Sequence, residues 1–166
     1  MHQHDSTLAH VAIGAAAGLA GTFVMQALMA ANKKLAPQTM PPIRRDPGEF
    51  MVEKAEEMVP YTAREKIPDA AETVAAKSLH MGYGATFGAL YAAMRPEGGS
   101  VLLEGPVLGL LTWAAGYLGW LPASGLMPPV WQHKPGQALV PPVNHALFGM
   151  ATVAAYDLLH DQILET

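Results

Sequence analysis

Four apolar stretches alternate with polar segments along the chain. They cover Leu8–Ala31, Ser78–Met94, Val101–Leu121 and Leu139–Tyr156, and Glu104 is the single carboxylate inside them. The first stretch alone has 24 residues without Asp, Glu, Lys or Arg. A helix of that length exceeds the hydrocarbon core of a bilayer, which is roughly 30 Å thick. The pattern therefore predicts an all-α integral membrane bundle of four transmembrane helices.

The second and fourth stretches repeat one motif, in which a histidine is followed by an aromatic residue, a glycine and a tyrosine at fixed spacing. The motif residues are His80, Tyr83, Gly84 and Tyr91 in the second stretch, and His145, Phe148, Gly149 and Tyr156 in the fourth. We therefore predict a single membrane domain, residues 1–166, built from a duplicated two-helix hairpin. Hairpin 1 would span 8–94, including a surface loop at 32–77, and hairpin 2 would span 101–160. Two-helix units repeated in the same order keep their direction, so the repeat would be parallel.

Small residues recur at the spacing that places them on one helix face. The pairs Gly14-x3-Gly18, Gly84-x3-Gly88 and Gly105-x3-Gly109 have this spacing, and Gly149 follows His145 by one turn. In lipid, close approach of two backbones supplies the packing that holds helices together. We expect these glycines to lie at helix–helix contacts.

The long polar segment at 32–77 contains signals for short helices. Asp46 offers an N-cap, followed by a proline and then by a glutamate three residues after the cap. Met51, Ala55 and Met58 then fall on one face, and a similar start occurs at Thr62. We interpret these pieces as amphipathic helices at the membrane surface, with a solvated charged linker as the alternative.

Composition supports the membrane interpretation and limits the chemistry. Charged residues make up 14% of the chain, against about 25% in typical soluble domains. The absence of cysteine excludes disulfides and thiolate sites. The net charge of −4 gives no footprint for nucleic acid.

The distribution of basic residues predicts an orientation. Loops one and three carry nine Lys and Arg residues, whereas Arg95 is the single one on the other side. The positive-inside rule then places loops one and three in the cytoplasm and both termini outside. Met1–Thr7 contains no Lys or Arg, so the first stretch does not resemble a signal peptide. Loop three is expected to be proline-rich, with Pro122, Pro128, Pro129, Pro135, Pro141 and Pro142.

Few side chains within the predicted spans carry chemistry. His80 and His145 are expected at similar depth, where two imidazoles could hold a haem or another metal, or form structural hydrogen bonds. Tyr91 and Tyr156 lie on the same helix faces as these histidines. Glu104 is a candidate proton or polar site, with snorkelling to the interface as the alternative reading.

His10 and His160 lie near the ends of the apolar stretches, on the same side as Glu104. The sequence shows no nucleophile–base spacing, phosphate loop or paired carboxylates. We therefore expect no enzymatic activity, no catalytic residue, no cofactor and no metal.

The main functional hypothesis is an accessory subunit or a stress-related factor that acts through helix–helix contacts. Its partners would be the lipid bilayer and a membrane protein or a second copy of the chain, without nucleic acid. The alternative is a proton- or ion-conducting bundle that uses Glu104 and the intramembrane histidines, and a haem-binding subunit is a weaker option.

Three segments carry a resemblance to a known family. His80–Tyr91, Leu110–Pro129 and Asn144–Gly149 resemble uncharacterised bacterial inner-membrane proteins of the YagU-like type. The resemblance implies a location in the bacterial inner membrane and a link to acid tolerance. It implies no catalytic residue.

Overall fold

The computed structural model describes residues 2–58, 60, 68–95 and 99–164, and the regular secondary structure within them is helical. This confirms the predicted all-α class. The elements are α1 (His2–Leu35), η1 (Pro37–Thr39), α2 (Pro47–Glu56), α4 (Asp69–Met94), α5 (Val101–Ala114), η2 (Ala115–Trp120), α6 (Leu121–Ala123), η3 (Val130–Gln132) and α7 (Pro135–Leu164).

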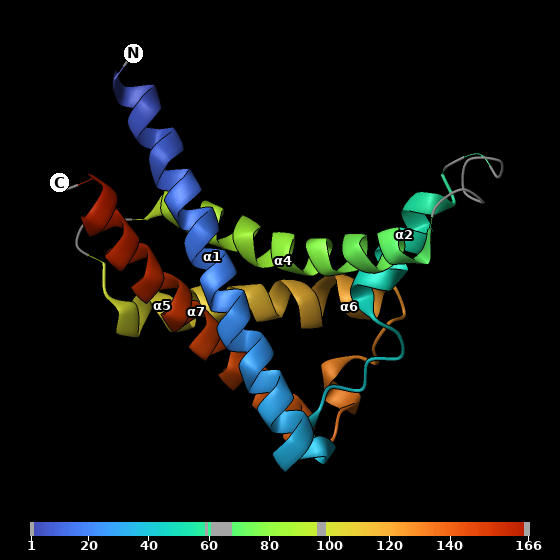
Figure 1. The fold of residues 1–166 in the computed structure, drawn as a ribbon. Coiled ribbons are helices and arrows are strands. Elements are labelled where there is room, and N and C mark those ends of the chain that lie inside the picture. Colours follow the sequence, from blue (N-terminus) through green and yellow to red (C-terminus); the bar gives the residue numbers. More distant parts are fainter. Residues whose placement is uncertain (1, 59, 61–67, 96–98, 165–166) are drawn as a thin grey trace.

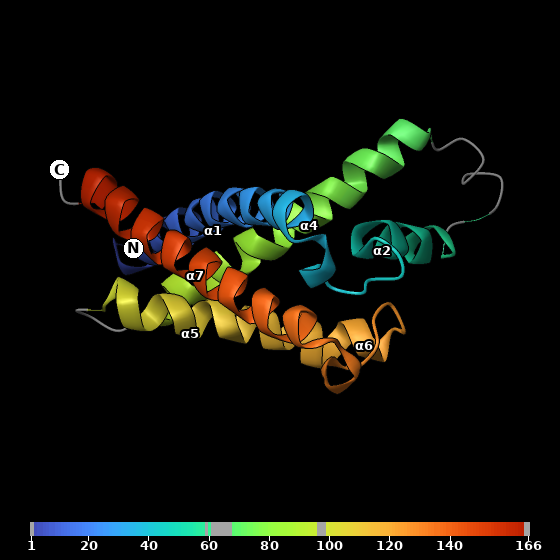
Figure 2. The same ribbon diagram turned by 90° about the horizontal axis from the view of Figure 1, so that it is seen from below.

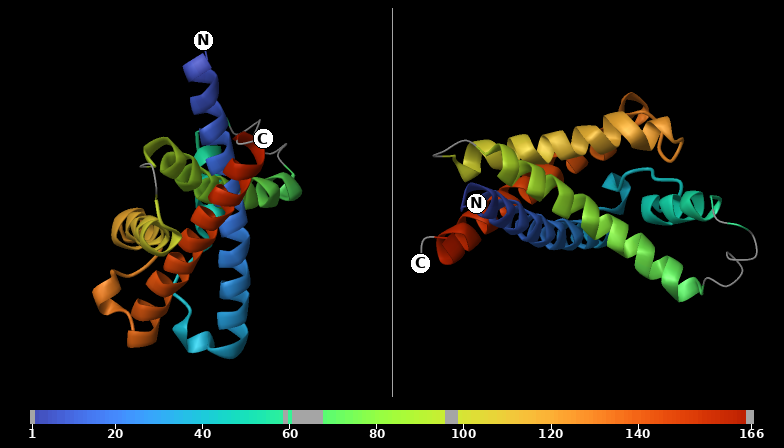
Figure 3. Two further views of the ribbon diagram at one scale, coloured as in Figure 1. Left: turned by 90° about the vertical axis from the view of Figure 1, so that its left-hand side faces the viewer. Right: turned by 90° about the horizontal axis from the view of Figure 1, so that it is seen from above.

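The four long helices pack in the order α4–α1–α7–α5. Helix α1 contacts both α4 and α7, and α5 contacts α7. In Figure 1, α1 and α7 run steeply while α4 and α5 lie across them. The left-hand view of Figure 3 shows α4 and α5 nearly end-on beside the long axis of α1. Each predicted hairpin thus contains one closely packed helix pair, and α1 and α7 join the two pairs.

Glycine allows the crossing of α1 and α4. A Cβ atom added at Gly18 would overlap the carbonyl oxygen of Gly84, and one added at Gly88 would overlap that of Gly14. Thr22 continues this contact one turn later, and its hydroxyl donates to the Gly18 carbonyl at 2.8 Å. The close approach of the two backbones replaces the hydrophobic force that lipid does not supply.

The crossing of α5 and α7 is built in the same way. A Cβ atom at Gly149 would overlap the carbonyl oxygen of Gly105, and one at Gly109 would overlap that of His145. In both crossings a Gly-x3-Gly pair meets a helix that arrives from the opposite direction. Gly149 here takes the place that Gly88 takes in the first pair, whereas the repeated sequence motif aligns Gly149 with Gly84, one turn earlier. The two crossings are therefore offset from the motif by one turn, and the duplication stays a prediction.

Within the residues that the structure describes, three helices are long and apolar enough to cross a membrane. They are Thr7–Leu35, Val101–Ala123 and Pro135–Ile163. They contain the first, third and fourth predicted stretches. The second stretch, Ser78–Met94, is the C-terminal part of α4. It has only 17 uncharged residues, and the preceding turns carry Lys77 and Glu72, which lower the apolar character of the helix.

The third span ends in a π-helical segment, η2, with non-helical dihedral angles at Gly119. The Leu121 N–H donates to the Gly116 carbonyl, five residues earlier. Pro122 has no N–H to donate, so the regular pattern cannot continue there. Such π segments are rare and locally widen a helix.

The prediction that loop three holds all six prolines was wrong. Pro135 begins α7, and Pro141 and Pro142 lie inside it. A proline fits the first turn of a helix because no intrahelical partner is needed for an N–H there. Pro141 and Pro142 leave two earlier carbonyl groups without their intrahelical donors, yet the helix continues through them.

In loop one, α2 begins as the sequence indicated. The Glu49 N–H donates to the Asp46 side chain at 3.0 Å, which confirms the predicted N-cap. Gly48 packs against the backbone of α4 at Ala76. Met51 and Ala55 of α2, and Met58 just beyond its end, are exposed. The helix start predicted at Thr62 lies outside the described residues.

Loops one and three meet at the far end of α5, which we call the loop end. Leu126 and Met127 are buried there with Tyr117 and Leu121, and Ile43 and Phe50 of loop one pack against them. The Arg44 N–H donates to the Leu126 carbonyl at 2.9 Å. Gly125 has a positive φ of 75°, which allows the sharp turn that precedes Leu126.

Candidate functional site

Polar and aromatic side chains from all four long helices meet at the end opposite the loop end. Figures 1 and 2 show that the ends of α4 and α7 and the beginnings of α1 and α5 lie on the same side of the molecule. We call the residues gathered there the polar cluster. Its members are His10, Tyr91, Arg95, Glu104, Tyr156, Asp157 and His160.

Arg95 is the centre of the polar cluster. Its guanidinium group forms an ion pair with Asp157 of α7, and its Nε lies 3.7 Å from Oε2 of Glu104 in α5. The same guanidinium lies 5.7 Å from the ring centroid of Tyr91 and 5.0 Å from that of Tyr156. The side chains of Arg95 and Glu104 are each only 18% exposed. One arginine therefore connects α4 with both α5 and α7 through charge and cation–π contacts.

The surroundings of Arg95 favour its charged form. Burial disfavours the charged form, but the hydrogen bond that Arg95 donates to Asp157 and the nearby charges outweigh it, so the pKa of Arg95 is raised above its usual value. Removing either partner of a buried pair leaves an uncompensated charge, which costs more than the pair itself contributes.

Glu104 is held from two sides. The Tyr91 hydroxyl donates to Oε2 of Glu104 at 2.5 Å, and Arg95 lies near the same oxygen atom. The sequence singled out Glu104 as an isolated carboxylate in a span. In the structure its charge is compensated by neighbouring side chains from α4, and α5 places it in the first turn.

Two histidines extend the polar cluster toward the chain termini. Nδ1 of His10 lies 2.8 Å from the Tyr156 hydroxyl, and the rings of His10 and His160 have centroids 4.9 Å apart. Tyr156 is only 2% exposed and contacts Tyr91 edge-on at 5.6 Å. These contacts join α1 and α7 at the same end where Arg95 joins α4 and α7.

The structure brings together four of the six predicted polar site residues. His10, Tyr91, Glu104 and Tyr156 belong to the polar cluster. Arg95 and Asp157 were missed as site residues. The signal was present, because Arg95 is the single basic residue on its side and the acidic residues near it end or begin a span.

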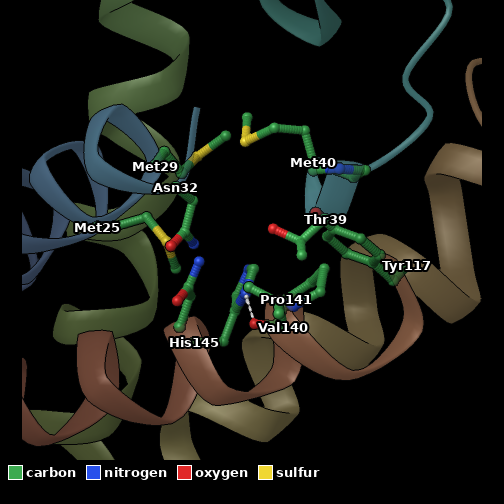
Figure 4. A pocket seen from close by; sticks show the side chains of 11 residues that line it. Met25, Met29, Asn32, Thr39, Met40, Tyr117, Val140, Pro141 and His145 are labelled. Atoms are coloured by element: carbon green, nitrogen blue, oxygen red, sulfur yellow. Dashed lines mark hydrogen bonds between the residues drawn. The ribbon is translucent and has the colours of Figure 1, made fainter. Parts of the chain in front are cut away.

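His80 and His145 lie apart from the polar cluster. His80 is exposed on α4. His145 is half-buried in α7, and its Nδ1 donates to the Pro141 carbonyl at 2.8 Å. It lines a pocket between α1, η1 and α7 that is shown in Figure 4, and His80 is not among the residues that line it.

The charged and hydroxyl groups of the polar cluster are engaged with one another. Its basic and acidic groups pair with one another, and its tyrosine hydroxyls are engaged by Glu104 and His10. Over residues 2–58, 60, 68–95 and 99–164, no three histidine, aspartate or glutamate side chains form a set that could hold a metal ion.

Comparison of the chain with protein-family models, with curated proteins and with solved structures finds no match. The resemblance to YagU-like proteins therefore stays a prediction from three segments of sequence.

Proposed function

We propose that this chain is a four-span protein of the bacterial inner membrane, without enzymatic activity, that acts as an accessory or stress-related factor through helix–helix contacts. The observation that carries the proposal is a difference between two parts of the molecule. The charges of the polar cluster pair within the chain, whereas the outer face of α5 is apolar and exposed. A protein built in this way offers a packing surface to other membrane components.

The outer face of α5 is continuous along the helix. Leu103, Val107 and Leu111 are spaced by four residues and are 73%, 57% and 60% exposed. Residues with this spacing share one helix face. In a bilayer such a face contacts lipid tails or the helix of a second protein, and both contacts depend on shape rather than on charge.

Photo-crosslinking in membranes tests the helix-contact role. A photoreactive residue at position 107 on the outer face of α5 should form a discrete adduct with a second protein or with another copy of the chain. A photoreactive residue in place of Lys54, which is exposed on α2, is the matched control and should not give that adduct. Lipid adducts alone at position 107, with a monomer in native mass spectrometry, would contradict the proposal.

The orientation has its own test, because the chain contains no cysteine and labelling has no background. If α4 also crosses the membrane, the chain has four spans, and loops one and three lie in the cytoplasm. A membrane-impermeant maleimide added to intact spheroplasts should then label Ile163→Cys and spare Lys54→Cys. Both positions are exposed in the structure. Labelling of Lys54→Cys would reverse the proposed orientation.

Proton or ion conduction receives less support from the geometry. The polar cluster occupies one end of the molecule, and a relay to the other end would need polar groups between them. The hydroxyls of Thr22 and Thr152 are buried near the middle, but each donates to a carbonyl of its own helix, at 2.8 and 2.9 Å. Two of the groups that a relay would use are thus already engaged.

A further inference from the structure

The pocket near the loop end gathers an unusual set of side chains. Met25 and Met29 lie one turn apart on α1, Met40 follows η1, and His145 comes from α7. Figure 4 shows the three thioethers and the imidazole around the same space. Three of the chain's ten methionines thus line one pocket with a histidine.

The hydrogen bond of His145 leaves one ring nitrogen for a ligand. Nδ1 lies 2.8 Å from the Pro141 carbonyl oxygen, drawn as a dashed line in Figure 4. A carbonyl oxygen can only accept, so Nδ1 carries the proton and Nε2 of the neutral ring carries a lone pair. Metal-binding histidines are commonly fixed in this way, with the far nitrogen bonded to a backbone carbonyl. Methionines alone are explained by packing, since methionine fills irregular gaps, but packing does not require this orientation of the histidine.

The size and charge of the pocket restrict the ligand. Its volume is about 20 Å³, which holds an ion or a water molecule and is too small for an organic ligand. The residues that line it include no carboxylate and no cysteine. Sites for hard cations such as Mg²⁺ and Ca²⁺ are built from oxygen ligands and usually include carboxylates. Thioethers are soft and neutral, and they select soft cations such as Cu(I).

We propose that Met25, Met29, Met40 and His145 form a binding site for one soft monovalent cation of the Cu(I) class. This site goes beyond the proposed helix-contact role and does not depend on it. Nothing in the polar cluster at the opposite end takes part. The site would tie α1, η1 and α7 together at the loop end, where no ion pair between these elements is seen among the described residues.

Silver(I) is a suitable probe, because it has the same charge and softness and does not change its oxidation state. The full-length protein in detergent, labelled with ¹³C at its methionine methyl groups, is titrated with Ag(I). A His2→Ala/His4→Ala background removes two terminal histidines that also bind soft ions. The methyl signals of Met25, Met29 and Met40 should shift together and saturate at one equivalent, while those of Met51 and Met94 stay in place.

Leucine variants give the second readout, because leucine keeps the volume of methionine and removes the sulfur. Met29→Leu and Met40→Leu should each weaken Ag(I) binding at least tenfold, measured by competition with a soluble thioether chelator. Met94→Leu, at an exposed position on α4, should leave the affinity unchanged. Circular dichroism verifies that each variant is folded. Shifts spread over all methionines, or equal affinity in Met29→Leu and Met94→Leu, would overturn the proposal.

Discussion

The two ends of the helix assembly are closed by different means. At the polar cluster, Arg95 joins the end of α4 to Asp157 and Glu104 by charge. At the loop end, Leu126 and Met127 are buried in an apolar cluster, and residues of loop one pack against it. The connections explain the difference. The chain passes from α4 to α5 in a few residues, whereas loops one and three are longer and contribute apolar residues to the cluster at the loop end.

This difference also determines how strictly each end is specified. Apolar burial is non-directional and tolerates several packings of similar volume. An arginine with two carboxylates and two aromatic rings has a narrow geometry. We therefore expect the polar cluster to favour one arrangement of the helix ends, and the loop end to add stability to it.

The loop end should depend mainly on volume. Met127 is only 2% exposed, so Met127→Ala should leave a cavity and lower the free energy of unfolding by about 2–5 kcal/mol. Met94→Ala, at a residue that is 79% exposed, should change it by less than about 0.5 kcal/mol. Denaturation with sodium dodecyl sulfate in mixed micelles measures both. If Met127→Ala and Met94→Ala lowered the free energy of unfolding equally, Met127 of loop three would not be packed in a core.

The polar cluster should depend on charge compensation. Arg95→Met keeps most of the side-chain volume but leaves Asp157 and Glu104 without their cation. We expect a loss of about 2–3 kcal/mol, less than for a fully buried pair because Asp157 is 32% exposed. Arg45→Met removes an exposed ion pair with Glu53 in loop one, and it should cost at most about 1 kcal/mol. A loss no larger than that of Arg45→Met would show that the polar cluster contributes no more than surface pairs do.

Between the two ends, helix packing should depend on the absence of side chains. Gly88→Ala places a methyl group against the backbone of α1 at Gly14, and it should lower the free energy of unfolding by about 1–2 kcal/mol. Gly82 lies on the same helix with open space around it. Gly82→Ala should therefore be neutral or stabilising by up to about 1 kcal/mol, because alanine favours the helix. The same denaturation assay distinguishes the two variants. A larger loss of stability for Gly82→Ala than for Gly88→Ala would place the crossing elsewhere on α4.

Most of the helices could be predicted from local signals in the sequence. The uncharged run from Leu8 predicted α1, and the cap at Asp46 predicted the start of α2, because both depend on residues close in sequence. The glycine pairs predicted close helix contacts, and the structure places them at the two crossings. Pro141 and Pro142 were assigned to a loop, since the cost of proline within a helix is a local rule that tertiary packing can override.

The candidate site was only partly predictable, because its contacts are long-range. Tyr91, Tyr156 and Glu104 were visible as polar residues in apolar stretches. That Arg95 would reach Asp157, 62 positions later, depends on the crossing order of the helices, which no local pattern contains. The similar depth expected for His80 and His145 was based on a repeated motif, but the crossings are shifted by one turn from that motif.

The most direct test of the account is a double-mutant cycle between the two halves of the chain. Arg95→Met, Asp157→Asn and the double variant are compared with the parent protein in the same unfolding assay. If the polar cluster joins the halves, the two changes should be coupled by at least about 1.5 kcal/mol, with the double variant less destabilised than the sum of the single ones. Losses that add to within about 0.5 kcal/mol would show that Arg95 and Asp157 act independently and would contradict the role of the polar cluster.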